Sequence, residues 1–392
     1  MVKEIYNIFI WIMVLFVCSA FSENYDTWSY STNIIINTTA SGADVSGDVV
    51  NFPLLIRLDA SNFDFSQAMS NGYDIRFSKS DMSQHLYYER ERWNLTASDS
   101  SAEFWVLCDT VFGNNNTQYI KMYWGNTGAA DSSEASAVFV TSNNFSAAWH
   151  LNEDGNETAL DATSANNDGT ANSFTTSSDV SGVIGIAREF DGSDDYLQIN
   201  NDIIKDVLYS GSKKTTLSFW VKADNTQAAK HLIWEGDITG NGWGSAEELH
   251  FTFGACPSGT NINDYITLYF GDDGDNTNGG YKVHASEAYS DTVNWHYAAV
   301  SVDNSNGSSE TAILYVDGVS VDTSTGTVQA NFDGWDTNTR IGRPGTNERY
   351  FDGILDEVRI ANDVRSADWI KLSYESQKTD QSLTEVKQTS AA

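Results

Sequence analysis

The amino-acid sequence predicts an all-β protein built from stacked antiparallel sheets. Short runs rich in Val, Ile, Tyr, Phe and Trp alternate along the chain with clusters of Asn, Asp, Gly and Ser, which are typical of turns. Aromatic residues make up 12% of the 392 residues, Pro occurs 3 times, and long helical patterns are nearly absent. A chain of this length suggests two domains of ordinary size.

The first 22 residues have the pattern of a secretory signal peptide. Lys3 precedes an apolar stretch, IYNIFIWIMVLFV, and the small residues Ala20 and Ser22 follow it. The apolar stretch is shorter than the roughly 20 residues that a membrane-spanning helix needs. We therefore expect cleavage after Ser22 and a secreted or cell-surface protein that is not integral to the membrane. An uncleaved anchor is the alternative.

The chain is strongly acidic, with a formal net charge of −32 at pH 7. Such a chain repels nucleic acid and anionic membrane surfaces, so neither is an expected partner. The acidity has two compatible explanations, solubility in a salty medium and the binding of divalent cations. The sequence leaves the oligomeric state open.

Removal of the signal peptide leaves two cysteines, Cys108 and Cys256. They fall in different predicted domains, and no C-x-x-C or Cys/His metal spacing occurs. Two separate buried thiols are therefore the favoured interpretation, and a disulfide is the alternative.

Residues 23–142 predict a β-sandwich of six strands without a helix. Each strand candidate is short, rich in β-branched or aromatic residues, and bounded by turn formers. In the fourth candidate Glu89 and Glu91 alternate with Arg90 and Arg92, which predicts a strand with a charged, solvent-facing side. The six candidates are WSYSTNIIINT, FPLLIRLDA, YDIRFSKS, LYYERERWN, AEFWVLCDT and TQYIKMYWG.

The motifs of this first segment also resemble a known domain family. NFPLLIRLD, NGYDIRFSKSD, a WVL strand and KMYWGN follow one another in the order found in a bacterial and archaeal domain of unknown function. The resemblance covers nearly all of residues 25–140. That domain is commonly found on exported multidomain surface proteins beside laminin-G-like modules. The resemblance implies a location and an architecture, and no chemistry.

Residues 145–377 resemble the laminin-G-like, concanavalin A-like jelly roll. The motifs FDGSDDYLQI, LSFWVKAD, a WH strand followed by LYVDG, and FDGILDEVRI occur in family order. The resemblance implies two packed antiparallel sheets. The one convincing helix is RSADWIKLSYES, with Ser366 as its N-cap. Residues 378–392 are predicted to be a disordered tail.

Two adjacent carboxylates, Asp356 and Glu357, raise the question of catalysis. Acid/base hydrolysis of a glycoside needs two carboxyl groups facing one ligand. In a regular strand side chains alternate, so Asp356 shares a face with Ile354 and Val358 while Glu357 points the other way. The pair is therefore not expected to act on one substrate, and Glu357 is predicted to be a surface partner of Arg359 or of a neighbouring strand.

The other catalytic signals are weak as well. Laminarinase-type hydrolases on this fold carry two Glu flanking an Asp on one strand face. Glu235 and Asp237 are the nearest approximation here, and the second Glu is missing. No nucleophile elbow, zinc-protease or phosphate-loop motif occurs. We predict no catalytic residue, with a polysaccharide hydrolase or lyase as the alternative. Five scattered histidines are expected to be structural: His150, His231, His250, His284 and His296.

The jelly-roll resemblance implies one structural calcium ion. A core-facing carboxylate such as Asp356 is costly unless it is hydrogen-bonded or holds a cation. Jelly rolls of this type often bind calcium with this carboxylate and a loop near the first strands of the module. The loop LDATSANNDG supplies Asp161, Asn167 and Asp168, and hard oxygen ligands favour calcium. Alternatively, Asp161 and Asp168 build turns and Asp356 accepts backbone N–H groups.

A carbohydrate ligand is expected to contact aromatic residues on loops, because sugars present apolar C–H faces beside their hydroxyl groups. Trp243 and Trp335 lie in turn-rich segments, and Arg343 and Asn347 are expected to line the same rim. We therefore predict a non-catalytic protein that binds a polysaccharide or glycoprotein, or acts in adhesion. A purely structural envelope or matrix protein is a further alternative.

Overall fold

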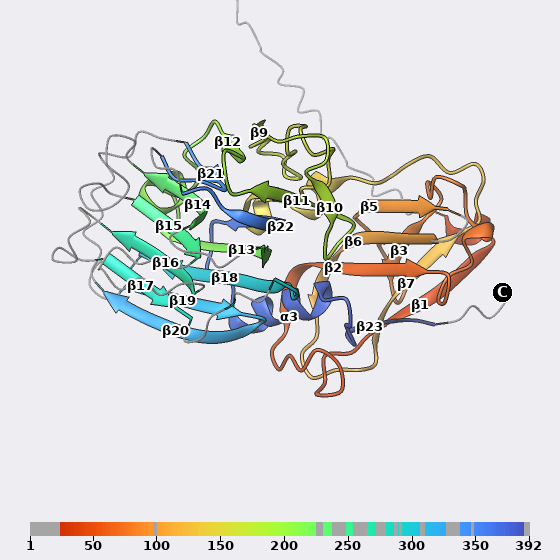
Figure 1. Ribbon diagram of the computed structural model, residues 1–392. Helices are drawn as coiled ribbons and strands as arrows, with labels where there is room; N and C mark the ends of the chain where they lie inside the picture. Colours follow the sequence, from red (N-terminus) through yellow and green to blue (C-terminus); the bar gives the residue numbers. More distant parts are fainter. Residues whose placement is uncertain are drawn as a thin grey trace, which may run out of the picture.

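The computed structural model describes residues 24–96, 100–224, 230–236, 248–253, 265–271, 280–285, 289, 292–305, 310–326, 338–345 and 349–387. These residues form four antiparallel sheets with a few short helices, which confirms the predicted all-β class (Figure 1). No helix within these ranges has the length and apolar character needed to cross a membrane. The predicted signal peptide lies outside the described residues.

The N-terminal domain is a sandwich of two sheets. A five-stranded sheet has the order β23-β1-β7-β3-β4, and a three-stranded sheet has the order β2-β6-β5. All six predicted strand regions are extended. The strands are β1 (Tyr30–Ile36), β2 (Val49–Asp59), β3 (Arg76–Lys79), β4 (His85–Leu86), β5 (Tyr88–Leu95), β6 (Ser100–Val111) and β7 (Gln118–Trp124).

The second domain is a jelly roll that follows the short helix α1 (Ala135–Val138). One sheet has the order β10-β11-β22-β13-β18-β19-β20, with β8 also pairing to β22, and the other has the order β17-β16-β15-β14-β21-β12-β9. Their strands are β8 (Phe145–Trp149), β9 (Gly169–Asn172), β10 (Asp179–Ser181), β11 (Ile186–Asp191), β12 (Tyr196–Ile199), β13 (Lys214–Ala223), β14 (Lys230–Gly236), β15 (Glu248–Phe253), β16 (Ile266–Gly271), β17 (Gly280–His284), β18 (His296–Asp303), β19 (Glu310–Val316), β20 (Val319–Gly326), β21 (Arg340–Ile341) and β22 (Asp352–Ala361).

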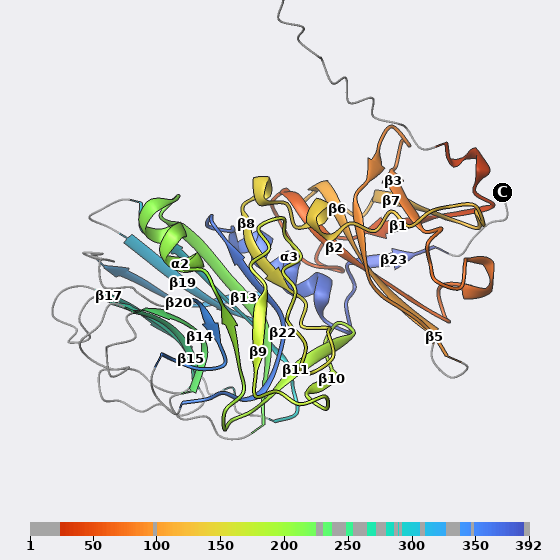
Figure 2. The same cartoon turned by 90° about the horizontal axis from the view of Figure 1, so that it is seen from above.

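The predicted C-terminal helix is confirmed as α3 (Ala367–Gln377). The Ser366 hydroxyl accepts a hydrogen bond from the Trp369 N–H at 3.1 Å, as an N-cap does. Both views place α3 between the two domains (Figure 1, Figure 2). The Trp369 ring lies 5.5 Å from Phe52 of β2, and Tyr374 packs on the jelly roll. The helix therefore connects the two domains by packing on both.

The predicted disordered tail is partly wrong, because it contains strand β23 (Thr384–Val386). This strand pairs antiparallel with β1, placing Val386 opposite Ile34 (Figure 1). Leu383, just before it, is fully buried. Without β23, strand β1 would present an unpaired edge of N–H and C=O groups, so the pairing satisfies them. Residues 388–392 lie outside the described part of the chain.

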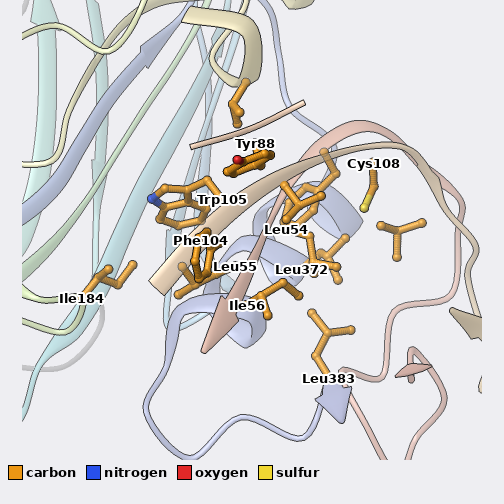
Figure 3. Close-up of a cluster of buried hydrophobic side chains, with 14 of the residues drawn as sticks. Leu54, Leu55, Ile56, Tyr88, Phe104, Trp105, Cys108, Ile184, Leu372 and Leu383 are labelled. Carbon is orange, nitrogen blue, oxygen red and sulfur yellow. The ribbon is translucent and has the colours of Figure 1, made fainter. Parts of the chain in front are cut away.

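The three-stranded sheet is buried on both faces, so one hydrophobic cluster extends from the N-terminal domain onto the jelly roll, which also has a cluster of its own. Residues 52–56 of β2 and 102–106 of β6 are buried without a break, although successive side chains point to opposite faces. One face packs on the five-stranded sheet. The other packs on the jelly roll, and Figure 3 shows Ile184 from that domain in the same cluster as Leu55 and Trp105. We call this second contact the domain seam.

Arg57 on β2 joins the domains by hydrogen bonds across the domain seam. Its guanidinium donates to three carbonyl groups at the end of α3, those of Ser376, Gln377 and Lys378, and to the Val183 carbonyl at 3.0 Å. The last carbonyl groups of a helix have no partner within the helix, so the arginine supplies one. Burial lowers the pKa of Arg57 to about 10, which leaves it charged at neutral pH.

Replacement of this arginine tests whether the domains unfold together. We expect Arg57→Ala to lower the free energy of unfolding by about 2–4 kcal/mol, because several buried carbonyl groups lose a charged donor. Urea unfolding followed by circular dichroism should show a single transition at a lower midpoint. Arg90→Ala, which removes a partly exposed ion pair with Asp131 in the N-terminal domain, is the matched control. Equal effects of the two variants would contradict this role.

Candidate functional site

Strand β22 contains a bulge at the two adjacent carboxylates. β13 pairs along one edge of β22, and β11 and β8 pair in turn with residues 352–355 and 358–361. At this change of partner the register shifts, and Glu357 takes a left-handed φ of 54°. A bulge adds one residue and breaks the alternation of side chains. The regular-strand prediction for this stretch is therefore wrong.

Glu357 is consequently buried rather than a surface residue. It is 1% exposed, and Asp356 is 0% exposed. The Glu357 carboxylate lies 2.8 Å from His150 Nδ1 and accepts a hydrogen bond from Arg359 at 2.7 Å. The Arg359 guanidinium stacks 4.4 Å above the Trp105 ring of the N-terminal domain. The predicted pairing of Glu357 with Arg359 exists, but it lies inside the domain seam.

Strand β5 brings two more carboxylates to the same place. Glu89 Oε2 lies 3.1 Å from His150 Nε2, and Glu91 Oε2 lies 3.1 Å from Nδ1. Glu91 also accepts hydrogen bonds from Trp105 Nε1 and, at 2.6 Å, from Asn152 Nδ2. The side of β5 that carries Glu89 and Glu91 is therefore covered by the jelly roll. We call Glu89, Glu91, His150 and Glu357 the seam cluster.

Burial and mutual repulsion strongly perturb these groups. Burial raises the pKa of Glu91 to about 8, and burial together with Glu357 raises the pKa of Asp356 well above its usual range. Burial disfavours the imidazolium of His150, but the three carboxylates around it raise its pKa well above the ordinary value. Burial also opposes ionisation of Glu357, yet His150 and Arg359 hold its pKa below the usual value.

A pocket of about 480 Å³ opens onto the seam cluster. Glu89 and His150 line it, whereas Glu91 and Glu357 do not. Its lining includes four carboxylate residues and no Lys or Arg, so it is an acidic pocket suited to a cationic group. The lining residues are Glu89, Glu134, Ala135, Ser136, His150, Asn152, Glu153, Leu160, Asp161, Ala162, Thr163, Ser164 and Asn166.

The structure brings together three of the four predicted calcium ligands and places Asp356 elsewhere. The Asp161 carboxylate accepts hydrogen bonds from the backbone N–H groups of Ala148, Thr163 and Asn167. Asp168 accepts one from the Asp161 N–H. Among the described acidic and His residues, Asp161 is not in a group of three whose ligand atoms converge within 4.8 Å. Asp161 and its neighbours thus form a hydrogen-bonded loop, and the calcium site stays a prediction.

Asp356 instead accepts hydrogen bonds from the backbone of a turn. Its Oδ2 accepts hydrogen bonds from the N–H groups of Val183 and Ile184, at 2.8 and 3.0 Å, in the turn between β10 and β11. These buried N–H groups need a partner, and Asp356 supplies it. This is the alternative that the sequence had left open for Asp356.

Replacement of Asp161 tests the calcium prediction. We expect Asp161→Asn to lower the melting temperature by the same amount with calcium and with a chelator, because the residue acts through hydrogen bonds to its own loop. Differential scanning fluorimetry with added calcium or EGTA measures this. A calcium-dependent rise in melting temperature that the variant abolishes would instead establish a calcium site, since an ion that binds the folded state stabilises it by mass action.

Of the predicted ligand-binding residues, only Arg343 lies within the described part of the chain. Trp243, Trp335 and Asn347 lie outside it. The Arg343 guanidinium stacks 4.7 Å from the ring of Tyr196 and 5.1 Å from that of Tyr350. These three side chains, all partly exposed, form what we call the Arg343 platform.

The hydrogen bonds of Arg343 fix the platform and leave donors available. The guanidinium donates to the Pro344 carbonyl at 2.9 Å, to the Gly345 carbonyl at 2.9 Å and to the Tyr350 hydroxyl at 3.0 Å. These bonds use three of its five N–H groups. The remaining two, beside two aromatic rings, are suited to a polar ligand with an apolar face.

The weak hydrolase candidate Glu235 is fully buried. Its carboxylate accepts hydrogen bonds from the N–H groups of Ile204 and Lys205, in α2 (Ile203–Lys205), and from the Thr339 hydroxyl. Burial raises the pKa of Glu235 to about 8 in spite of these donors. Asp237 lies outside the described residues. The contacts of Glu235 therefore give it a structural role.

The pKa of Glu235 predicts a pH-dependent stability. The folded protein retains the proton up to about pH 8, whereas the unfolded chain releases it near its ordinary value of 4.5. Between these values unfolding releases a proton, so the free energy of unfolding falls as pH rises. A Gln side chain cannot ionise, so Glu235→Gln lacks this pH-dependent part of the free energy of unfolding. Urea unfolding from about pH 5 to about pH 8 should show wild type losing stability relative to the variant. A difference that does not change with pH would contradict the prediction.

Sequence reasoning missed the seam cluster. His150 was predicted to be a scattered structural histidine, and β5 to have a charged solvent face, with no choice between its Glu side and its Arg side. One signal was present: the unbroken apolar run FPLLI in β2 is typical of a strand that is covered on both faces. The sequence did not indicate which part of the chain covers the second face.

Comparisons with known families confirm the predicted domain types. Residues 191–371 match the model of the concanavalin A-like lectin/glucanases superfamily, of the laminin-G type. Residues 71–154 match a Domain of unknown function (DUF2341). The superfamily includes both lectins and glucanases, so the match does not decide between binding and catalysis. No curated protein matches the sequence.

Several solved structures resemble the chain at low sequence identity. Domain 4 of AbnA, a GH43 extracellular arabinanase from Geobacillus stearothermophilus in complex with arabinotriose, is 20% identical at a TM-score of 0.43, covering 58% of this chain and 97% of that one. The Ruminococcus gnavus IT-sialidase CBM40 bound to alpha2,3 sialyllactose is 18% identical at 0.31, covering 41% and 82%. The receptor binding domain of botulinum neurotoxin D is 14% identical at 0.40, covering 60% of this chain and about half, 53%, of that one. These values support no inference about a ligand.

Proposed function

We propose that the protein is a secreted or cell-surface, non-catalytic carbohydrate-binding protein whose jelly roll binds a polysaccharide or glycoprotein glycan. The single observation that carries the proposal is the Arg343 platform. Two aromatic rings and a fixed guanidinium with unused donors combine the apolar and polar contacts that a sugar ring needs.

The non-catalytic part of the proposal is supported by the contacts of the described carboxylates. Glu235 binds backbone N–H groups in the domain interior, and the side chains of Glu91 and Glu357 are each 1% exposed in the domain seam. A glycosidase instead needs two carboxyl groups on opposite sides of an accessible sugar. A polysaccharide hydrolase remains the second candidate, because the matched superfamily contains glucanases.

A glycan array with and without calcium tests the proposal. We expect wild type to bind at least one glycan class, and Arg343→Ala to weaken that binding by about tenfold or more, because the variant loses the stacked guanidinium and its donors. Arg90→Ala is the matched control, since Arg90 stacks 4.8 Å over Tyr73 in the N-terminal domain and should leave binding unchanged.

Two outcomes would contradict this proposal. Wild type that binds no glycan would refute carbohydrate binding. Equal binding by wild type and Arg343→Ala would refute the Arg343 platform as the site. Release of reducing sugar from a bound polysaccharide would favour the hydrolase instead.

A further inference from the structure

The seam cluster holds His150 in the manner of a metal-binding histidine. A histidine that ligates a metal with one ring nitrogen commonly donates the other ring N–H to a carboxylate, which fixes the ring. His150 Nδ1 lies 2.8 Å from Glu357 Oε1, and Arg359 in turn binds the other oxygen of Glu357. His150 Nε2 is directed toward Glu89, which lines the acidic pocket, and Nδ1 also lies 3.1 Å from Glu91 Oε2, so Glu91 must turn toward Nε2 to share an ion with it.

Three ligand atoms converge beside this pocket, which two of their residues, Glu89 and His150, line. One ligand atom each from Glu89, Glu91 and His150 lies within 4.8 Å of the other two. Donors that surround one tetrahedral ion at about 2.0–2.2 Å lie about 3.3–3.6 Å apart, so the three side chains must close around the ion to bind it. Asn152 and Trp105 already hold Glu91 in place by hydrogen bonds.

The charges of the seam cluster favour a cation. Three carboxylates face His150, and Arg359 is the guanidinium paired with them. Carboxylate groups gathered in a buried place repel one another unless a proton or a cation lies between them. A divalent ion would offset this repulsion.

We propose that Glu89, Glu91 and His150 bind one divalent transition-metal ion of the zinc class, with Glu357 orienting His150. A mixed nitrogen and oxygen donor set favours such an ion over calcium or magnesium. The ion joins the domains, because β5 supplies two ligands and the jelly roll supplies the third. Three protein ligands leave a fourth position for water or a ligand oxygen on the pocket side. This site is independent of the Arg343 platform.

Metal titration of the full-length protein tests the proposal. The protein is stripped with a chelator, and zinc is added in a calorimeter with excess magnesium to occupy exposed carboxylates. We expect one zinc ion per chain and a higher melting temperature. Cobalt should give visible absorption bands of a site with a nitrogen ligand. Glu89→Gln should weaken binding by about tenfold or more, and should keep its fold because Glu89 is the seam carboxylate that reaches the pocket.

The control variant is Asp194→Asn. Asp191, Asp194 and Asp195 form the other converging acidic group among the described residues, but they lack a histidine. We expect Asp194→Asn to bind zinc like wild type. If Glu89→Gln does not fold, His150→Gln serves in its place, with near-ultraviolet circular dichroism to verify folding.

Four results would overturn the metal site. The first is an absence of stoichiometric zinc binding in wild type. The second is an equal loss of affinity in Glu89→Gln and Asp194→Asn, which would indicate general attraction to an acidic chain. The third is unchanged zinc affinity in a folded His150→Gln, because the site requires the imidazole. Loss of apo stability in Glu89→Gln together with no metal binding would assign the cluster to ion pairing alone.

Discussion

The three-stranded sheet β2-β6-β5 is covered on both faces, and this double burial constrains the surrounding structure. A buried sheet face needs apolar side chains or fully partnered polar ones. β6 supplies Trp105 to the domain seam, and β5 supplies Glu89 and Glu91, which contact His150 there. Arg57, on the same face of β2, donates a hydrogen bond to a carbonyl group at the end of α3. The polar contacts between the domains thus follow from the placement of one small sheet.

The two domain types that the family models distinguish form one packed body in this chain. Family boundaries describe which segments recur in evolution, whereas the hydrophobic cluster that contains Trp105 also contains Ile184 and Trp369. The bulge at Glu357 also contributes to the packing of the two domains. It lies where β22 exchanges β11 for β8, and it directs charged side chains out of the jelly-roll core toward the N-terminal domain.

Local patterns predicted the fold well and the candidate site poorly. The six N-terminal strands and α3 with its Ser366 cap follow from short-range propensity, which the sequence displays directly. The seam cluster depends on contacts between segments far apart in the chain. The strand alternation that separated Asp356 from Glu357 failed because a bulge arises from a change of partner strand, which no local pattern reports. The same long-range pairing accounts for the ordered part of the tail.

The pairing of β1 with β23 sets an order for folding during synthesis. Strand β1 is made before the jelly roll, but its partner β23 follows the whole jelly roll. At ribosomal rates of about 5–20 residues per second, the edge of β1 waits on the order of tens of seconds for this partner. During that interval it can accept a strand from another chain. The N-terminal domain is therefore completed last. Misassembly between nascent chains is most costly during the interval in which β1 lacks its partner.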